Sequence, residues 1–340
     1  MLDSLVAKIP WIAGTGPQTA IALFSQCSLM RNLGGFAFPG TFSEEEERAV
    51  EERILGVLEN LGLMSVGQYY SLSGIDPREA YLLAERRLIP FDLLNGRLHA
   101  GVYVAEDQSL SIAVNGANHL CLTAIGPGLQ FQELHNRLNL LDDTLAGMLD
   151  YAFDTKFGFL TRSIAHVGTG LKASVMLHLP ALVMENGLPP LLQTLRQRRH
   201  VLNGQKSTLA APPAHAPATG ENDRRLALIH HQPSLAEALY YDLSGILYGD
   251  INDSQGDLFL LANQNTLGAS EEEMLFHLRH SAVEIIARET DTRKNLMDRE
   301  HRRLEDRVAR ALGVARSARL LGFSEALSLL SSIRLGVDTG

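Results

Sequence analysis

The stretch from Gly96 to Ile125 constrains the fold more than any other part of the chain. It reads GRLHAGVYVAEDQSLSIAVNGANHLCLTAI, in which alternating and β-branched residues predict two strands joined by a polar turn at residues 106–108. On both sides of this stretch the apolar spacing becomes helical. Residues 41–62 and 131–151 each place apolar side chains on one face of a predicted helix. The sequence therefore predicts a fold that mixes strands with long amphipathic helices.

The first of these helices has a clear start signal. Ser43 is the predicted N-cap, and glutamates crowd the first turn, where the helix dipole favours negative charge. Ser270 and Glu273 form a second capping box, and an apolar stripe at helical spacing follows them. Charged and apolar residues from 294 onward are almost all helical in pattern. We therefore expect a helical C-terminal subdomain at 271–340, after a first domain at 1–270.

Two further segments fix the organisation of the first domain. Residues 203–222 read NGQKSTLAAPPAHAPATGEN, which has no periodicity and predicts a flexible insertion. Residues 257–268 read DLFLLANQNTLG, which predicts a buried strand that ends in a turn. We see no internal repeat. The insertion thus divides the α/β part of the chain.

Composition excludes several classes of function. The chain has 340 residues and a formal net charge of −9, and an acidic balance argues against binding to a nucleic-acid backbone. Cys27 and Cys121 match neither a metal motif nor a disulfide framework, so both thiols are expected to be free in a reducing cytosol. The first residues lack the pattern of a signal peptide, and no apolar run reaches the length of a membrane span. We expect a cytoplasmic protein that binds neither membrane nor nucleic acid.

A glycine turn is the first candidate for chemistry, because glycines before a helix often hold phosphate. Residues 168–173, GTGLKA, fit a dinucleotide fingerprint on paper, but the acidic residue expected about 20 positions on is missing, since Glu185 comes too early. Arg162 and His166 also interrupt the strand that should precede it. The order of glycine and lysine excludes a P-loop. This motif alone does not identify a nucleotide site.

Other catalytic motifs are weaker still. The 12 histidines include no HExxH pair and no zinc-type spacing, so no metal site is expected. His119 and His178 lie in apolar surroundings and are interpreted as core histidines. No GxSxG nucleophile elbow occurs. The acidic run at residues 44–47 is interpreted as a solvated helix start.

Five segments taken together are far more specific than any single motif. They read PWIAGTGPQTAIALFSQCSLMRNLGGFAFPG, SIAVNGANHLCLTAI, YAFDTKFGFLTRSIAHVGTGLKASVMLHLPALV, LYGDINDSQGDLFLLANQNTLGASEEE and LEDRVARALGVARSARLLGFSEALSLLSSIRLGVD. In this order they resemble the phosphagen (guanidino) kinase family and, within it, the bacterial protein-arginine kinases. The resemblance covers most of the chain outside residues 195–235.

The resemblance implies an α+β fold with a mostly antiparallel sheet flanked by helices, followed by a helical C-terminal subdomain. It also implies transfer of the γ-phosphoryl group of ATP to a guanidinium, with arginines and Mg²⁺ holding the triphosphate and carboxylates orienting the guanidinium. Such chemistry depends on positioning and charge, because arginine forks match phosphate oxygens and an anion must accept the guanidinium proton. The glycine turn would then lie beside the nucleotide pocket, followed by an apolar segment that we interpret as helix-like.

The residues of this chain depart from the family at the positions that hold phosphate. The positions where the family carries arginine are occupied here by Gln26, Ser28, Cys121 and either Gly245 or Ser244. A further family arginine is Lys172 here, which keeps the charge without the bidentate fork. Of the first block's arginines only Arg31 remains, and the family's reactive cysteine is Ser163. The nucleotide-binding positions are therefore mostly substituted.

The carboxylate positions are also changed. The family's catalytic glutamate falls at Ala117, and its acidic neighbours fall at Gly116 and Asn118. His119 is retained. The acid of the flexible loop is Asp250, one methylene shorter than the family's glutamate. Asp250 is thus the one candidate catalytic acid that the resemblance leaves.

These substitutions predict a catalytically impaired pseudokinase. Loss of one preorganised donor costs about 3–4 kcal/mol of a total acceleration of about 8–23 kcal/mol, so four lost arginines would remove most of it even with strong non-additivity. We expect action through protein binding or dimerisation, as a homodimer or with an adaptor or activator partner. No cofactor is then expected.

Two alternatives stay open. An active protein-arginine kinase with an altered site would use Mg-ATP, and a vacated cleft could hold another small ligand. The segment after RLGVD in which the family carries a basic phosphoarginine-sensing motif is expected to be missing, which argues against recognition of phosphoarginine.

Overall fold

The computed structural model describes residues 15–94, 97–191, 241–245, 256–263 and 266–339. The predicted insertion at 203–222 and the candidate acid Asp250 lie outside the described residues. Within these residues, none of the helices combines the length and the apolar character needed to cross a membrane.

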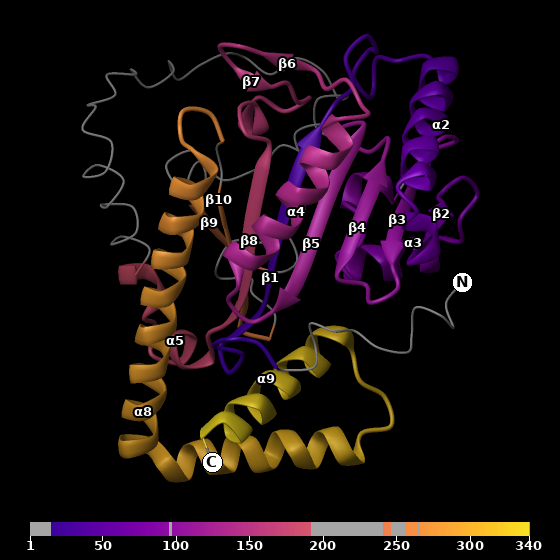
Figure 1. Cartoon of the computed structure of the whole chain (residues 1–340). Helices are drawn as coiled ribbons and strands as arrows, with labels where there is room; N and C mark the ends of the chain where they lie inside the picture. Colours follow the sequence, from indigo (N-terminus) through magenta and orange to yellow (C-terminus); the bar gives the residue numbers. More distant parts are fainter. Residues whose placement is uncertain (1–14, 95–96, 192–240, 246–255, 264–265, 340) are drawn as a thin grey trace, which may run out of the picture.

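An eight-stranded sheet forms the centre of the molecule, in the order β2-β3-β4-β5-β1-β8-β10-β9 (Figure 1). All of its neighbouring strands pair antiparallel. The strands are β1 (Ala22–Arg31), β2 (Gly67–Ser71), β3 (Gly101–Ala105), β4 (Leu110–Val114), β5 (Leu120–Pro127), β8 (Leu171–His178), β9 (Tyr241–Gly245) and β10 (Leu258–Asn263). A separate small hairpin joins β6 (Phe153–Asp154) and β7 (Gly158–Phe159).

The predicted pair of strands is confirmed, with its turn between β3 and β4, but the stretch contains a third strand. Residues 120–127 continue as β5, which pairs with β4 on one side and with β1 on the other. The interpretation of the apolar segment after the glycine turn as helix-like is wrong. Residues 171–178 form strand β8 at the centre of the sheet, and five of them are fully buried hydrophobic side chains or nearly so. A run buried on both faces does not alternate, so its periodicity cannot distinguish helix from strand.

The helices cover the sheet on both faces. They are α2 (Glu44–Asn60), α3 (Pro77–Glu85), α4 (Phe131–Ala146), α5 (Pro180–Met184), α8 (Glu271–Ser317) and α9 (Phe323–Thr339). Helices α2, α4 and the first half of α8 pack in one large apolar core against the first face. Helix α3 and the 3-10 turn Phe91–Leu93 cover β2, β3 and β4 on the second face through a smaller core, and Cys121 of β5 packs at its edge.

Both predicted capping boxes are confirmed. Ser43 accepts a hydrogen bond from the Glu46 backbone N–H, and the Glu46 carboxylate accepts one from the backbone N–H of Ser43. Ser270 and Glu273 make the same reciprocal pair at the start of α8. Each box satisfies backbone donors that have no partner inside the helix, which fixes where the helix begins.

The C-terminal region is helical, as expected, but the two halves of α8 pack against different elements. Its first half packs on the sheet, and non-helical backbone at Glu300 bends the second half beneath the sheet, where it runs beside α9 (Figure 1). An ionic cluster joins the two parts, because buried Arg293 pairs with buried Glu289 at 2.8 Å and with the more exposed Asp338 of α9 at 3.0 Å. The division into domains at residue 270 stays a prediction.

Candidate active site

Strands β5, β1 and β8 present one row of polar side chains on the second face of the sheet, beyond the part that α3 covers. Strand pairing places Ser28 directly between Thr123 of β5 and Lys172 of β8. Gln26 lies beside Ser174 in the same way, and Met30 beside Cys121. Side chains directly opposite each other on neighbouring strands share a face. This group, Gln26, Ser28, Cys121, Thr123, Lys172 and Ser174, is called the polar face below.

Four of the predicted nucleotide-binding positions therefore meet on the polar face, and three of them are joined by weak neutral contacts. The Ser28 and Thr123 hydroxyls are 2.9 Å apart. Gln26 Nε2 donates to Ser28 Oγ at 3.4 Å, and Cys121 Sγ lies 3.8 Å from Thr123 Oγ1. Ser28 and Thr123 are 5% and 6% exposed, so their hydroxyl pair is buried. Neutral groups that satisfy one another in this way offer little to an anion.

The charge of the polar face is carried by Lys172, whose side chain is exposed. Burial and the neighbouring Lys172 ammonium together lower the pKa of His166 to about 4, so His166 is neutral near pH 7. Burial, with the Asp92 carboxylate nearby, raises the pKa of the Cys121 thiol to about 11. That thiol therefore stays protonated near neutral pH and is a poor nucleophile.

The loop between β4 and β5 holds Ala117, the position at which the resemblance predicts the family's catalytic glutamate. Asn115 fixes the start of this loop, because its side-chain amide donates to the carbonyl oxygens of Glu47 and His99. Asn118 fixes its end by accepting from the Asn32 amide at 2.8 Å and from the backbone N–H of Arg162 at 3.1 Å. The loop is thus held by amide groups, with a methyl side chain at the position where the resemblance predicts an acid.

One acidic side chain does approach this loop from another element. A Cβ atom placed on Gly116 would lie 3.2 Å from Asp92 Oδ2, so the Asp92 carboxylate sits against the backbone beside Ala117. Asp92 is exposed and lies in the 3-10 turn between α3 and β3. Sequence pattern does not point to Asp92, because nothing in the spacing of the chain connects residue 92 with residue 116.

His119 does not join the polar face. Its Nδ1 accepts from the Leu33 backbone N–H at 2.9 Å, and Nε2 lies 3.0 Å from the carbonyl oxygen of Ala37, to which it donates in the matching tautomer. Burial is the main cause that lowers its pKa. The prediction of a core histidine is therefore confirmed, and His119 holds the 33–37 backbone rather than facing a ligand. His178 is likewise buried and hydrogen-bonded, to Ser331.

Arg31, the retained arginine of the first block, also points away from the polar face. Its Nε and Nη2 donate to Asp142 Oδ2 at 3.0 and 2.7 Å, and Nη1 donates to the carbonyl oxygen of Thr169 at 2.8 Å. The Phe159 ring centroid lies 3.6 Å from its Cζ. Arg31 is 2% exposed. Its guanidinium is therefore committed to the protein interior.

The glycine turn has a packing role that its geometry explains. Gly170 has φ +70°, and a Cβ there would lie 2.6 Å from the Met30 carbonyl oxygen. A Cβ on Gly168 would lie 2.7 Å from the Thr266 carbonyl oxygen. Both glycines thus let the backbone pass close to β1 and to the segment after β10, and the turn leads into a strand rather than a helix. No phosphate-binding helix start is formed here.

The remaining predicted positions lie outside the polar face. Ser163 is exposed and precedes a short 3-10 turn at Ile164–His166. Ser244 and Gly245 lie in β9 and pair with Leu260 and Phe259 of β10. Thr123 and Ser174 were missed, although the alternation of β-strands would have placed Thr123 on the face of Cys121, two residues away. Among the described residues, no group of three His, Cys, Asp or Glu side chains is placed to hold a metal ion.

The sheet order and the position of this face define a guanidino-kinase fold. Solved structures support this assignment: the duplicated taurocyamine kinase of Schistosoma mansoni aligns with a TM-score of 0.62 at 18% identity, over 84% of this chain and 35% of that chain. Lombricine kinase aligns with a TM-score of 0.59 at 17% identity, over 85% of this chain and 70% of that one. Identities this low establish the fold alone.

Sequence relatives define the family. The chain is 34% identical to the protein-arginine kinase of Pelotomaculum thermopropionicum over 96% of its own length and 81% of the relative's. It is 34% identical to that of Symbiobacterium thermophilum over 98% and 84%. Residues 49–209 match the ATP:guanido phosphotransferase C-terminal catalytic domain, and residues 301–340 match the protein-arginine kinase McsB C-terminal domain. This chain belongs to the protein-arginine kinase family of ATP:guanido phosphotransferases.

Proposed function

We propose that this chain is a catalytically impaired member of its family that acts by binding protein, as a homodimer or with an adaptor or activator. The observation that carries the proposal is the buried contact between the Ser28 and Thr123 hydroxyls at 2.9 Å. It stands where the family resemblance places a guanidinium. A hydroxyl that already has a partner cannot replace a bidentate, charged donor toward a phosphate oxygen.

The donor set of the polar face does not fit Mg-ATP. Gln26, Ser28 and Cys121 are neutral, and Cys121 stays protonated because burial raises the pKa of its thiol to about 11. Lys172 adds one point charge without a fork. A triphosphate carries several negative charges, and each loses hydrating water on binding. This loss is unfavourable unless protein donors replace the water. Nothing on these strands supplies that replacement, so we derive no phosphoryl-transfer step.

An active protein-arginine kinase with an altered site is the second candidate. The relatives at 34% identity bear the name protein-arginine kinase. The Asp92 carboxylate beside Gly116 is a negative group near the position where the family orients a guanidinium. In this candidate, Asp92 and Asp250 would share the work of the missing glutamate at Ala117.

A transfer assay distinguishes the two candidates. The purified chain is incubated with ATP labelled at the γ-phosphate, Mg²⁺ and an arginine-rich protein, and acid-labile label on the protein is counted. Our proposal predicts no transfer above the level of an Asp250→Asn control. Transfer that Asp250→Asn or Asp92→Asn abolishes would contradict the proposal and establish the second candidate.

A further inference from the structure

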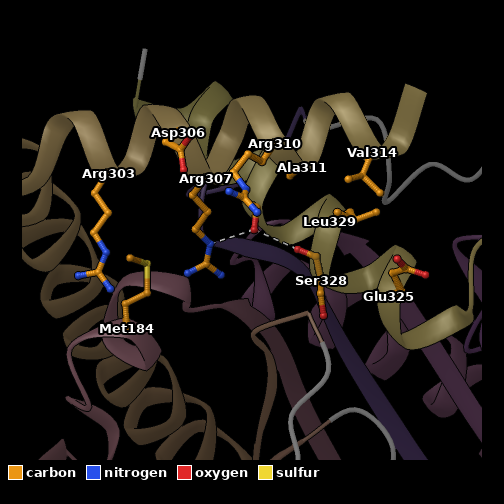
Figure 2. A pocket seen from close by; sticks show the side chains of 11 residues that line it. Met184, Arg303, Asp306, Arg307, Arg310, Ala311, Val314, Glu325, Ser328 and Leu329 are labelled. Atoms are coloured by element: carbon orange, nitrogen blue, oxygen red, sulfur yellow. Dashed lines mark hydrogen bonds between the residues drawn. The ribbon is translucent and has the colours of Figure 1, made fainter. Parts of the chain in front are cut away.

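A groove lies between the second half of α8 and helix α9, with α5 at one end (Figure 2), and none of its lining residues belongs to the polar face. Its volume is about 490 Å³. Apolar side chains of Met184, Val314 and Leu329 line it together with arginines of α8. The residues that line this groove have no part in the proposed loss of catalysis.

The charge of this region is opposite to that of the chain. Residues 299–319 contain seven arginines against three acidic residues, whereas the whole chain has a formal net charge of −9. Arg303, Arg307 and Arg310 recur at the spacing that puts side chains on one helix face, and all three line the groove. In Figure 2 the side chains of Arg303 and Arg307 extend from α8 in the direction of Met184. The three arginines therefore form a basic rim beside an apolar floor, which consists of Met184, Val314 and Leu329.

The central arginine is held in place by α9. Arg307 Nε donates to Ser332 Oγ at 3.1 Å, and Ser332 Oγ donates in turn to the Ser328 carbonyl oxygen at 3.1 Å. This arrangement leaves the two terminal nitrogens of Arg307 as donors for a ligand. Arg303 pairs with Glu300 at 2.9 Å, but that pair is exposed and contributes little. Arg307 is thus positioned before any partner arrives.

The lining selects one kind of occupant. Asp306 and Glu325 also border the groove, so a small inorganic anion would meet repulsion as well as attraction. A longer ligand can place carboxylates on Arg307 and Arg310 and lay an apolar side chain on the floor. We propose that this groove binds an acidic, amphipathic peptide segment of a partner protein. The proposal rests on the proposed function in protein binding, and names the surface and the chemistry of the partner.

The test uses fluorescence anisotropy and a defined probe. The probe is a fluorescein-labelled 12-residue peptide of glutamates with two leucines four positions apart, and its counterpart has lysine at every glutamate. We expect the acidic peptide to bind the full chain at least ~10-fold more tightly than the lysine peptide, with affinity that falls as salt increases. The double variant Arg307→Ala/Arg310→Ala is expected to weaken acidic-peptide binding at least ~10-fold.

Controls separate the groove from general charge. Arg48→Ala/Arg53→Ala removes two exposed arginines of α2 and should leave the affinity unchanged. Val314→Asn should weaken binding through loss of the apolar contact alone, because it adds no charge. If Arg307→Ala disturbs folding, Arg310→Ala keeps the test, because Arg310 is exposed. Equal binding of the two peptides, an unchanged affinity in Arg310→Ala, or displacement of the peptide by millimolar inorganic phosphate would overturn the proposal.

The peptide-binding assay tests the groove separately from the proposed loss of catalysis. Peptide binding is measured without ATP, so phosphoryl transfer by the wild-type chain would refute the proposed loss of catalysis and leave the groove intact. Failure of the peptide to bind, with transfer also absent, would refute the groove alone.

Discussion

Replacement of Arg31 by alanine tests whether the retained arginine serves the protein interior or a ligand. The Arg31 guanidinium makes two hydrogen bonds to Asp142 Oδ2, at 3.0 and 2.7 Å, and is 2% exposed. Its Nη1 group also donates to the carbonyl oxygens of Met30 and Thr169. Arg31→Ala would leave the Asp142 carboxylate buried without a counter-charge, which typically costs about 3–5 kcal/mol of the free energy of unfolding.

Urea denaturation followed by circular dichroism measures this loss. We expect a lower midpoint with an unchanged slope, because the same surface is exposed on unfolding. Arg48→Ala on the exposed side of α2 is the matched control and should change stability by less than about 0.5 kcal/mol. The variant Arg31→Met/Asp142→Leu should recover most of the loss, because removing both charges leaves none unpaired. A loss below about 1 kcal/mol for Arg31→Ala would refute the structural role.

Two other predictions concern the glycine turn and the polar face. The proton NMR titration of His166 should have its midpoint near pH 4, because burial and Lys172 lower its pKa to about 4, and Lys172→Met should move that midpoint upward. Since an unfolded histidine titrates near pH ~6.5, the stability linked to His166 should be present above that pH and lost as pH falls toward 4; a midpoint near 6.5 in the folded chain would contradict this. Gly170→Ala should lower stability by about 1–3 kcal/mol more than Gly35→Ala, measured by urea denaturation. Both glycines have positive φ, but only at Gly170 would the new Cβ meet backbone, 2.6 Å from the Met30 carbonyl oxygen, so equal losses would refute the contact.

Local signals in the sequence predicted the helices well. Ser43 and Ser270 mark helix starts through chemistry confined to four residues, and this chemistry does not depend on the rest of the fold. Val50 and Ile54 of α2 are fully buried, as their spacing predicted. Strand β8 was misjudged because a strand buried on both faces lacks the alternation that identifies a strand.

The candidate site was predictable only in part. The resemblance placed Gln26, Ser28, Cys121 and Lys172 in one site, and strand pairing brings these four to one face. Pairing between distant strands decides which side chains meet, and a single sequence does not encode it locally. For the same reason the contact of Asp92 with the loop at Gly116 could not be foreseen.

The groups that hydrogen-bond Arg31 and His119 could not be predicted from the sequence either. Arg31 and His119 have the residue types that the family pattern predicts, and only their hydrogen-bond partners in the structure show what they do. Asp142 lies 111 residues from Arg31, and the Leu33 amide lies 86 residues from His119. The residue type alone therefore did not show which protein groups Arg31 and His119 contact.

Isothermal titration calorimetry with Mg-ATP tests the central claim most directly. The polar face has one exposed lysine and neutral neighbours that bond to one another, so we predict a dissociation constant weaker than about 1 mM, which is about 4 kcal/mol of binding free energy. Binding tighter than that, lost in Lys172→Met, would contradict the account and place a working nucleotide site on strands β1, β5 and β8.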